Sequence, residues 1–358
     1  MDYVAVALGI FILIFVLADM TNTMISLRTS RSKWWLTFRF YRGSWRLLKR
    51  AAMRNNNVHR REHFMAVFAP ASLLLLLMIW LSLQILGFAL IWWGTDSLSG
   101  GSGLWNAVYF SGVVFFTVGF GDVVPDGGLS QFAAVAEALM GVLTVALVIA
   151  YLPGLIAAFG RRELRVVTLD DGGDGPVTPM GLVLARAPDR SAAEMFDYFE
   201  SWEQWVADAA ESLSTYPMII FFRSRHAGQN WLTALNLVTD AALICQTMVD
   251  GHNRNPYFLI RRTTYFVQII TSEADLSQYE LDFADSAEEY LRVFNERYDR
   301  LETAGFNLLP RDQALEIVRD LRSAYTPGLA YLIHQLAAPV EFWSQGEGFR
   351  PSTACIVD

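Results

Sequence analysis

The sequence predicts an all-α membrane protein in which three transmembrane helices and a re-entrant helix precede a mainly α-helical cytoplasmic domain. Three observations predict this class. Of the 358 residues, 53% are hydrophobic and only 18% are charged, which is more apolar than an ordinary soluble protein. Three long stretches are almost free of charge, and the hydrophobic residues beyond position 190 recur with the period of α-helices.

Each apolar stretch is long enough to cross a membrane once, because a hydrocarbon core of about 30 Å needs about 20 helical residues. The first lies in residues 1–27, where Tyr3 to Ala18 carries no charge. The second runs from Phe64 to Trp93 without a charge, and the third, Phe132 to Phe159, contains only Glu137. The first stretch has neither a preceding basic segment nor a small-x-small cleavage site, so we interpret it as a retained helix and not a signal peptide.

The basic residues predict the orientation. Residues 28–63, the connector between the first two stretches, hold 11 Lys and Arg against the single Glu62, a net charge of +10. Loops rich in Lys and Arg stay on the cytoplasmic side. We therefore expect a multi-pass protein of the plasma or inner membrane with its N-terminus outside. Arg161, Arg162 and Arg165 follow the third stretch at once, which agrees with this orientation.

The connector predicts an interfacial helix. Its Arg42, Arg46, Arg50 and Arg54 recur at every fourth position beside apolar residues, whereas a voltage sensor carries Arg at every third position within an apolar span. We expect this helix to lie on anionic membrane lipids. Asp19 is expected to pair with a connector Arg, and a functional role for this acid is the alternative.

The stretch FFTVGFGDVVP, residues 115–125, follows the apolar segment Leu104 to Phe116, which is too short to cross and return. Non-helical backbone is tolerated at membrane depth only where protein or a water-filled cavity surrounds it. Gly119 and Gly121 allow alternate residues to take positive φ, so that successive carbonyls point to one side. Such a row of carbonyl oxygens can replace the water around a dehydrated cation.

TVGFGD, residues 117–122, closely resembles the TVGYGD signature of potassium channel filters, and residues 64–160 are similar to the two-transmembrane pore module (ion channel 2 type) of bacterial potassium channels. The resemblance implies a selectivity filter that holds K⁺ ions, with no organic cofactor and no enzymatic activity. The ion-binding residues would be Thr117, Val118, Gly119, Phe120 and Gly121, and Asp122 would lie at the pore mouth.

Three positions depart from the family pattern. Phe120 replaces the usual Tyr, Val113 is apolar where some members carry a Glu that bonds the Asp, and Phe116 stands where many members have a second Thr. We therefore expect the conformation of the filter to depend more on packing than on hydrogen bonds, and slow filter closure becomes a hypothesis.

One filter strand per chain supplies carbonyls on one side only, so the resemblance implies a homotetramer. The Trk-type transporters, by contrast, carry four filter repeats in one chain. In the third span, Gly141 is a candidate hinge, with close helix packing as the alternative. Pro153 and Gly154 predict a kink and a candidate gate. Glu137 is expected to face the extracellular funnel, with pairing to a pore element as the alternative.

Residues 161–358 hold 17 Arg, no Lys and 29 acids, a net charge of −12, so a salt-sensitive contact with the basic connector is expected. We divide this part into a linker (161–190), a helical regulatory domain (191–345) and a C-terminal tail (346–358). Short strands are expected at Leu164 to Leu169 and Val177 to Ala185. Helices are expected after the capping box Ser191 and Glu194, over Trp231 to Met248, from Ser286 to about Leu301, from Pro310, and after Pro327.

The candidate ligand site in this domain is formed by Arg223, Arg225 and His226, which precede a helix N-terminus and so could hold a phosphate or carboxylate of an unidentified cytoplasmic ligand. We favour the alternative that the two Arg pair with the domain's own carboxylates. Cys245 and Cys355 are expected to be free thiols. No metal-ligand spacing is found, and no nucleic-acid partner is expected.

The leading hypothesis is a tetrameric potassium channel whose helical domain sets the open probability of the gate. A membrane-anchored signalling or scaffold protein with a weakly conducting pore is the alternative from another class. A poorly selective cation channel is the third hypothesis, which the departures at Phe116 and Val113 allow.

Overall fold

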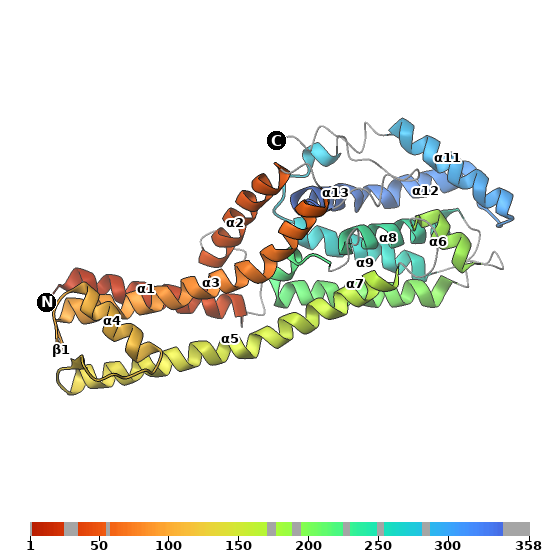
Figure 1. The fold of residues 1–358 in the computed structure, drawn as a ribbon. Helices are drawn as coiled ribbons and strands as arrows, with labels where there is room; N and C mark the ends of the chain where they lie inside the picture. The colour runs from red at the N-terminus through yellow and green to blue at the C-terminus, as the bar shows by residue number, and fades with distance from the viewer. Residues whose placement is uncertain are drawn as a thin grey trace. The chain divides into compact units, whose positions relative to one another are not determined.

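The computed structural model describes residues 2–24, 35–54, 58–169, 177–187, 195–224, 230–248, 254–280 and 287–338 (Figure 1). The described residues divide into two compact units. The membrane unit comprises Met1–Ala158 together with Leu213–Phe222, and the C-terminal unit comprises Phe159–Ser212 together with Arg223–Asp358. Both units consist mainly of α-helices, as the sequence predicted.

The three predicted spans are confirmed as helices long and apolar enough to cross a membrane. They are α1 (Tyr3–Met24), α3 (Val58–Thr95) and α5 (Gly128–Thr168), and α5 continues from the membrane unit into the C-terminal unit. The short apolar helix between α3 and α5 is α4 (Leu104–Phe115), and the connector forms α2 (Leu36–Met53). On α2 the predicted amphipathic pattern is present, because Tyr41 and Trp45 are buried while Arg42, Arg46 and Arg50 are exposed.

Helix α1 packs along α3 (Figure 1). Small residues allow this close approach: a Cβ atom on Gly9 would collide with the carbonyl oxygen of Gly87. At the other end of the contact, the backbone N–H of Asp2 donates to the carbonyl of Gly94 over 2.7 Å. Glycine at helix crossings is a common way for membrane helices to pack without bulky side chains between them.

The residues around α4 are bracketed by a two-stranded antiparallel ribbon that the sequence did not predict. Strand β1 (Leu98–Ser99) pairs with β2 (Val124–Pro125), with Leu98 opposite Pro125 and Ser99 opposite Val124. The ribbon joins the chain ahead of α4 to the chain after residues 117–122, so both ends of this re-entrant segment are fixed together.

Asp19 is buried near the start of α2, and its described side-chain partners are neutral donors. Its carboxylate accepts hydrogen bonds from the backbone N–H of Thr37 (3.2 Å), the hydroxyl of Thr37 (2.7 Å) and Nε1 of Trp80 (2.9 Å). The expected pairing with a connector Arg stays a prediction, because the side chains of Arg28, Arg31, Arg60 and Arg61 lie outside the described residues. Neutral donors satisfy a buried carboxylate without bringing a second charge out of water.

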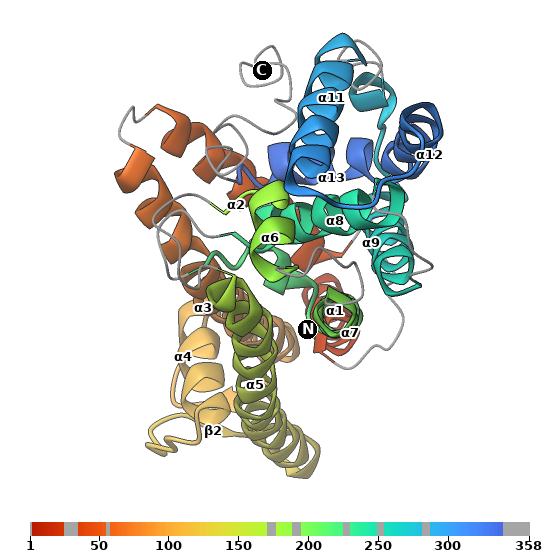
Figure 2. The ribbon, with the colours of Figure 1, turned by 90° about the vertical axis from the view of Figure 1, so that its right-hand side faces the viewer.

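The C-terminal unit is built around a buried helix, α8 (Trp231–Thr247), which confirms the predicted core helix. It packs against α6 (Pro179–Arg186), α9 (Asn255–Thr271), α12 (Arg311–Ser323) and α13 (Thr326–Gln335), as Figures 1 and 2 show. The remaining helices are α7 (Phe196–Thr215), whose last three residues belong to the membrane unit, and α11 (Ala287–Ala304). The predicted helices after Pro310 and Pro327 are confirmed as α12 and α13, whereas the sequence did not predict α9.

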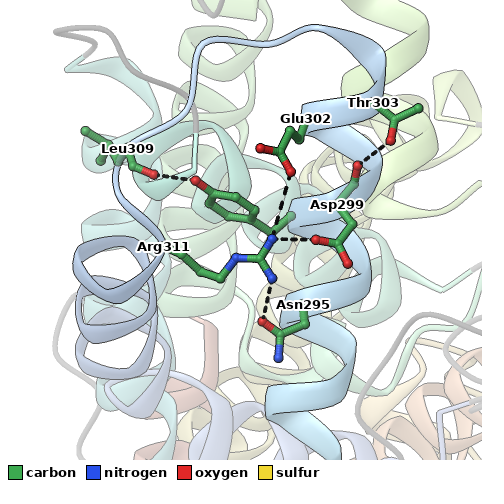
Figure 3. Close-up of polar contacts among 7 residues, drawn as sticks. Asn295, Asp299, Glu302, Thr303, Leu309 and Arg311 are labelled. Atoms are coloured by element: carbon green, nitrogen blue, oxygen red, sulfur yellow. Dashed lines mark hydrogen bonds and ion pairs between the residues drawn. The ribbon is translucent and has the colours of Figure 1, made fainter.

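The α11–α12 connection is held by Arg311, which comes at the start of α12. Its guanidinium donates to Asp299 (2.5 Å) and Asn295 (3.3 Å) and lies 4.0 Å from Glu302, as Figure 3 shows. The guanidinium also stacks over the ring of Tyr298 at 4.3 Å. An ion pair and a cation–π contact therefore join the last turns of α11 to the start of α12.

The two strands expected in the linker are wrong. Residues up to Thr168 continue α5, and residues 179–186 form α6. Thr178 accepts a hydrogen bond from the N–H of Gly181 (2.9 Å) and Pro179 occupies the first helical turn, which together start a helix. A short apolar run is compatible with either a buried strand or a buried helix.

Several predictions lie outside the described residues: the capping box Ser191 and Glu194, the helix start at Ser286, and the C-terminal tail with Cys355. Cys245 is a buried free thiol, and burial raises its pKa to about 12.

Candidate functional site

The backbone that follows α4 is anchored on the last carbonyls of that helix. The N–H of Thr117 donates to the carbonyl of Val114 (2.9 Å), and the N–H of Val118 donates to the carbonyl of Val113 (2.8 Å). The position of residues 117–121 is therefore set by the C-terminal turn of α4.

Positive φ angles alternate along this segment. They occur at Thr117 (57°), Gly119 (64°) and Gly121 (79°). The alternation at the two glycines agrees with the prediction, whereas the positive φ of Thr117 was not predicted. A β-branched residue in this region is a conformational outlier that costs on the order of 1–3 kcal/mol, and such strain is typical of functional sites.

Within a single chain the segment has one open side. Val118 and Phe120 are 52% and 70% exposed, and a Cβ atom on Gly119 or Gly121 would meet no other group within 4 Å. Large exposed apolar side chains beside strained backbone indicate that something else, a neighbouring chain or lipid, covers this region.

Asp122 is tied to α4 by a residue that the sequence did not indicate, Tyr109. The hydroxyl of Tyr109 donates to Oδ2 of Asp122 over 2.8 Å. Because Val113 and Phe120 lack polar groups, hydrogen bonds were expected to contribute little here. A tyrosine two turns before Thr117 was the available signal, but its spacing from Asp122 along the chain does not reveal the contact.

Glu137 of α5 does not face a funnel, so the favoured expectation for it is wrong. The residue is fully buried, and it pairs with pore elements, which was the alternative expectation. Nε1 of Trp92 on α3 donates to Oε2 over 2.7 Å, and the hydroxyl of Ser111 on α4 contacts Oε1. Hydrogen-bonding partners from two packed helices make burial of this carboxyl group possible.

Gly141 lies where α5 touches the end of α4. A Cβ atom at this position would collide with the carbonyl oxygen of Phe115. The glycine therefore permits close packing, and its role as a hinge stays a prediction. Pro153 and Gly154 lie inside α5, which continues through both residues.

The segment Leu213–Phe222, here called the docking segment, belongs to the membrane unit although it lies late in the chain. Its 3₁₀ helix η2 (Pro217–Phe221) carries Phe221 into a cluster of three aromatic rings from α2 and α3. The ring of Phe221 stacks on Tyr41 at 5.5 Å, with Trp45 at 5.2 Å and Phe68 at 5.9 Å. Burial raises the pKa of Tyr41 to about 12.

The docking segment also contacts α5 at the candidate gate. The ring of Tyr216 packs against Tyr151 at 5.1 Å, and a Cβ atom on Gly154 would collide with the Tyr216 hydroxyl. Tyr216 therefore packs directly against α5 at Gly154. The docking segment thus connects α2, α3 and α5.

The structure describes Arg223 from the candidate ligand site, whereas Arg225 and His226 lie outside the described residues. Arg223 donates to the carbonyls of Leu336 (2.7 Å) and Ala337 (2.6 Å), at the C-terminal end of α13. The N-terminus of α8 is capped by Asn230, which accepts from the N–H of Leu232 (2.8 Å). A structural role in capping α13 accounts for Arg223, and the anion site stays a prediction.

Two apolar helices that flank a short helix and a segment of alternating positive φ define a pore-forming class of membrane protein. Residues 75–157 match the family model described as "Ion channel". This part of the chain is therefore similar to ion channels, which agrees with the resemblance to a two-transmembrane pore module seen in the sequence. The match points to a non-enzymatic protein.

The chain is also similar to the "Uncharacterized membrane protein YdjJ" of Bacillus subtilis (strain 168), at 33% identity over 118 residues. The alignment covers 31% of this chain and 35% of YdjJ, so the chain spans about a third of this relative's length. No solved structure matches the chain.

Proposed function

We propose that this ion channel is selective for potassium and that K⁺ ions bind the carbonyl oxygens of residues 117–121. The observation that carries the proposal is the alternation of positive φ at Thr117, Gly119 and Gly121 within the sequence TVGFGD. Because positive and negative φ alternate along this segment, successive carbonyls point toward one side. Such a row of carbonyl oxygens can replace the hydration shell of a cation.

The conducting unit is a homotetramer. One strand surrounds an ion on one side only, and a closed ring of identical chains supplies the other sides. The exposed side of residues 117–121 in the single chain supports this assembly. A row of exposed apolar residues on α5 is available for neighbouring chains or lipid: Phe132, Val135, Leu139 and Val142.

The membrane orientation follows from the connector. The exposed arginines of α2 favour contact with the anionic lipids of the cytoplasmic leaflet, which leaves the N-terminus outside and the C-terminal unit in the cytoplasm.

Gating is controlled by the C-terminal unit through the docking segment. This segment is joined at both ends to the C-terminal unit, and it contacts α5 at Gly154, beside Pro153. Any rearrangement of the C-terminal unit that displaces residue 212 or 223 would change the contact between the docking segment and α5. We assign the docking segment a closing role: while bound, it holds the inner end of α5 in the closed state.

The experiment that tests selectivity compares potassium with sodium flux through the purified protein in liposomes. Flux that prefers potassium supports the proposal, and equal fluxes would instead establish a poorly selective cation channel. If the folded tetramer passes neither ion, deletion of residues 170–358 distinguishes two causes. The deletion removes the docking segment and should open a closed gate, so that flux appears. A scaffold protein would still pass neither ion after the deletion.

Replacing Tyr109 by Phe is expected to make potassium flux decay several-fold faster. The substitution removes the hydroxyl that holds Asp122 to α4 and leaves the ring in place. Because Val113 and Phe120 offer no polar group to replace it, the outer end of the filter would collapse more readily. The time course of flux after a potassium gradient is imposed measures this, with Tyr3→Phe, 77% exposed on α1, as the control. A decay identical to that of the native chain would contradict the expectation.

A further inference from the structure

A buried polar cluster joins α4 to α3 and α5. Glu137 and Ser111 are both fully buried in the single chain. The hydroxyl oxygen of Ser111 lies within hydrogen-bond distance of Oε1 of Glu137 and 2.9 Å from the carbonyl oxygen of Ile85 on α3. Oε2 of Glu137 accepts the Nε1–H of Trp92 over 2.7 Å.

The protons available in this cluster are consistent with a neutral Glu137. A serine hydroxyl has one proton to donate, and a backbone carbonyl can only accept. If Ser111 donates to Ile85, the proton between Ser111 and Glu137 must belong to the carboxyl group. Trp92 supplies a donor to the other oxygen, so every group is satisfied when Glu137 is a neutral acid.

Burial favours the same state. An ionised carboxylate inside an apolar region needs a cationic partner or several donors, because its desolvation is costly. Among the described residues, no ion pair is found for Glu137. A neutral acid, by contrast, donates one hydrogen bond and accepts another, which is what Ser111 and Trp92 provide.

The cluster also fixes α4 in register on α5. Glu137 and Gly141 lie four residues apart on α5, and the groups that they meet, Ser111 and Phe115, lie four residues apart on α4. Residues at this spacing share one face of a helix. The same last turn of α4 supplies the carbonyls that anchor the N–H groups of Thr117 and Val118. A shift at Glu137 is therefore transmitted to the start of the filter.

We propose that Glu137 is a protonated carboxylic acid that positions α4 and, through α4, the carbonyls of the filter. The positioning role rests on the proposed potassium selectivity, whereas the protonation state does not. In this role Glu137 replaces the polar support that Val113 cannot give from within α4.

Infrared spectroscopy and flux measurements on the full-length protein test the two parts separately. The native protein at neutral pH is expected to show a protonated carboxylic acid band that disappears in Glu137→Gln. The same variant should keep the native ratio of potassium to sodium flux, because an amide also donates one hydrogen bond and accepts another. Glu137→Ala removes both bonds and should lower the ratio several-fold.

Two further variants complete the design. Ser111→Ala should shift the acid band and lower the flux ratio. This variant tests the positioning role if Glu137→Ala does not fold. Glu316→Gln, the same chemical change at an exposed position of α12, should leave the acid band and the ratio unchanged.

An acid band that persists in Glu137→Gln would overturn the protonated state. A native flux ratio in both alanine variants would overturn the positioning role. If the native protein itself shows no preference for potassium, the proposed function fails, and the infrared result still decides the protonation state of Glu137.

Discussion

Replacing Gly119 by Asp is expected to abolish potassium flux while the protein remains folded and tetrameric. Gly119 has a φ of 64°, and a Cβ atom there would meet no other group within 4 Å. The aspartate therefore fits the single chain without a collision, and Asp is among the residues that tolerate this region. In the tetramer, however, four carboxylates would stand around the ion path and disturb the carbonyls that replace the water shell of K⁺.

Flux into potassium-loaded liposomes, compared with empty liposomes, measures this effect, and size-exclusion chromatography checks the assembly. The matched control is Gly43→Asp on α2, because a Cβ atom at Gly43 also meets nothing within 4 Å. This control carries the same new charge outside the pore and should conduct as the native chain does. Native flux in Gly119→Asp would show that ions do not pass residues 117–121.

Local sequence patterns predicted the spans, the short helix α4 and the glycines at 119 and 121. Hydropathy determines whether a helix can cross a membrane, and glycine marks positive φ without any knowledge of neighbours. The positive φ of Thr117 was not predictable in this way, because a β-branched side chain gives no sign of it. The strand expectations failed for a related reason: short apolar runs do not distinguish a strand from a buried helix.

Contacts between residues far apart in the chain were not predictable in this way. Trp92 lies 45 residues before Glu137, and Trp80 lies 61 residues after Asp19. Hydropathy identified both acids as unusual but could not supply their partners. Nothing in the stretch PMIIFF at 217–222 indicated that Phe221 joins aromatic rings of α2 and α3.

Replacing Phe221 by Ala is expected to raise the open probability of the channel. The ring of Phe221 is half-buried and contacts Tyr41, Trp45 and Phe68, so its removal should weaken binding of the docking segment by about 2 kcal/mol. Once the docking segment is released, Tyr216 no longer contacts Gly154, and the inner end of α5 is free to move.

Single-channel recording in planar bilayers measures the open probability, and hydrogen exchange of residues 217–222 measures release of the docking segment. The matched control is Phe258→Ala on α9, where the same ring is removed from a position that is 45% exposed. That variant should change neither quantity. Faster exchange in Phe221→Ala with an unchanged open probability would show that the docking segment binds the membrane unit without controlling the gate. Faster exchange together with more frequent opening would establish that the contact at Gly154 holds the pore closed.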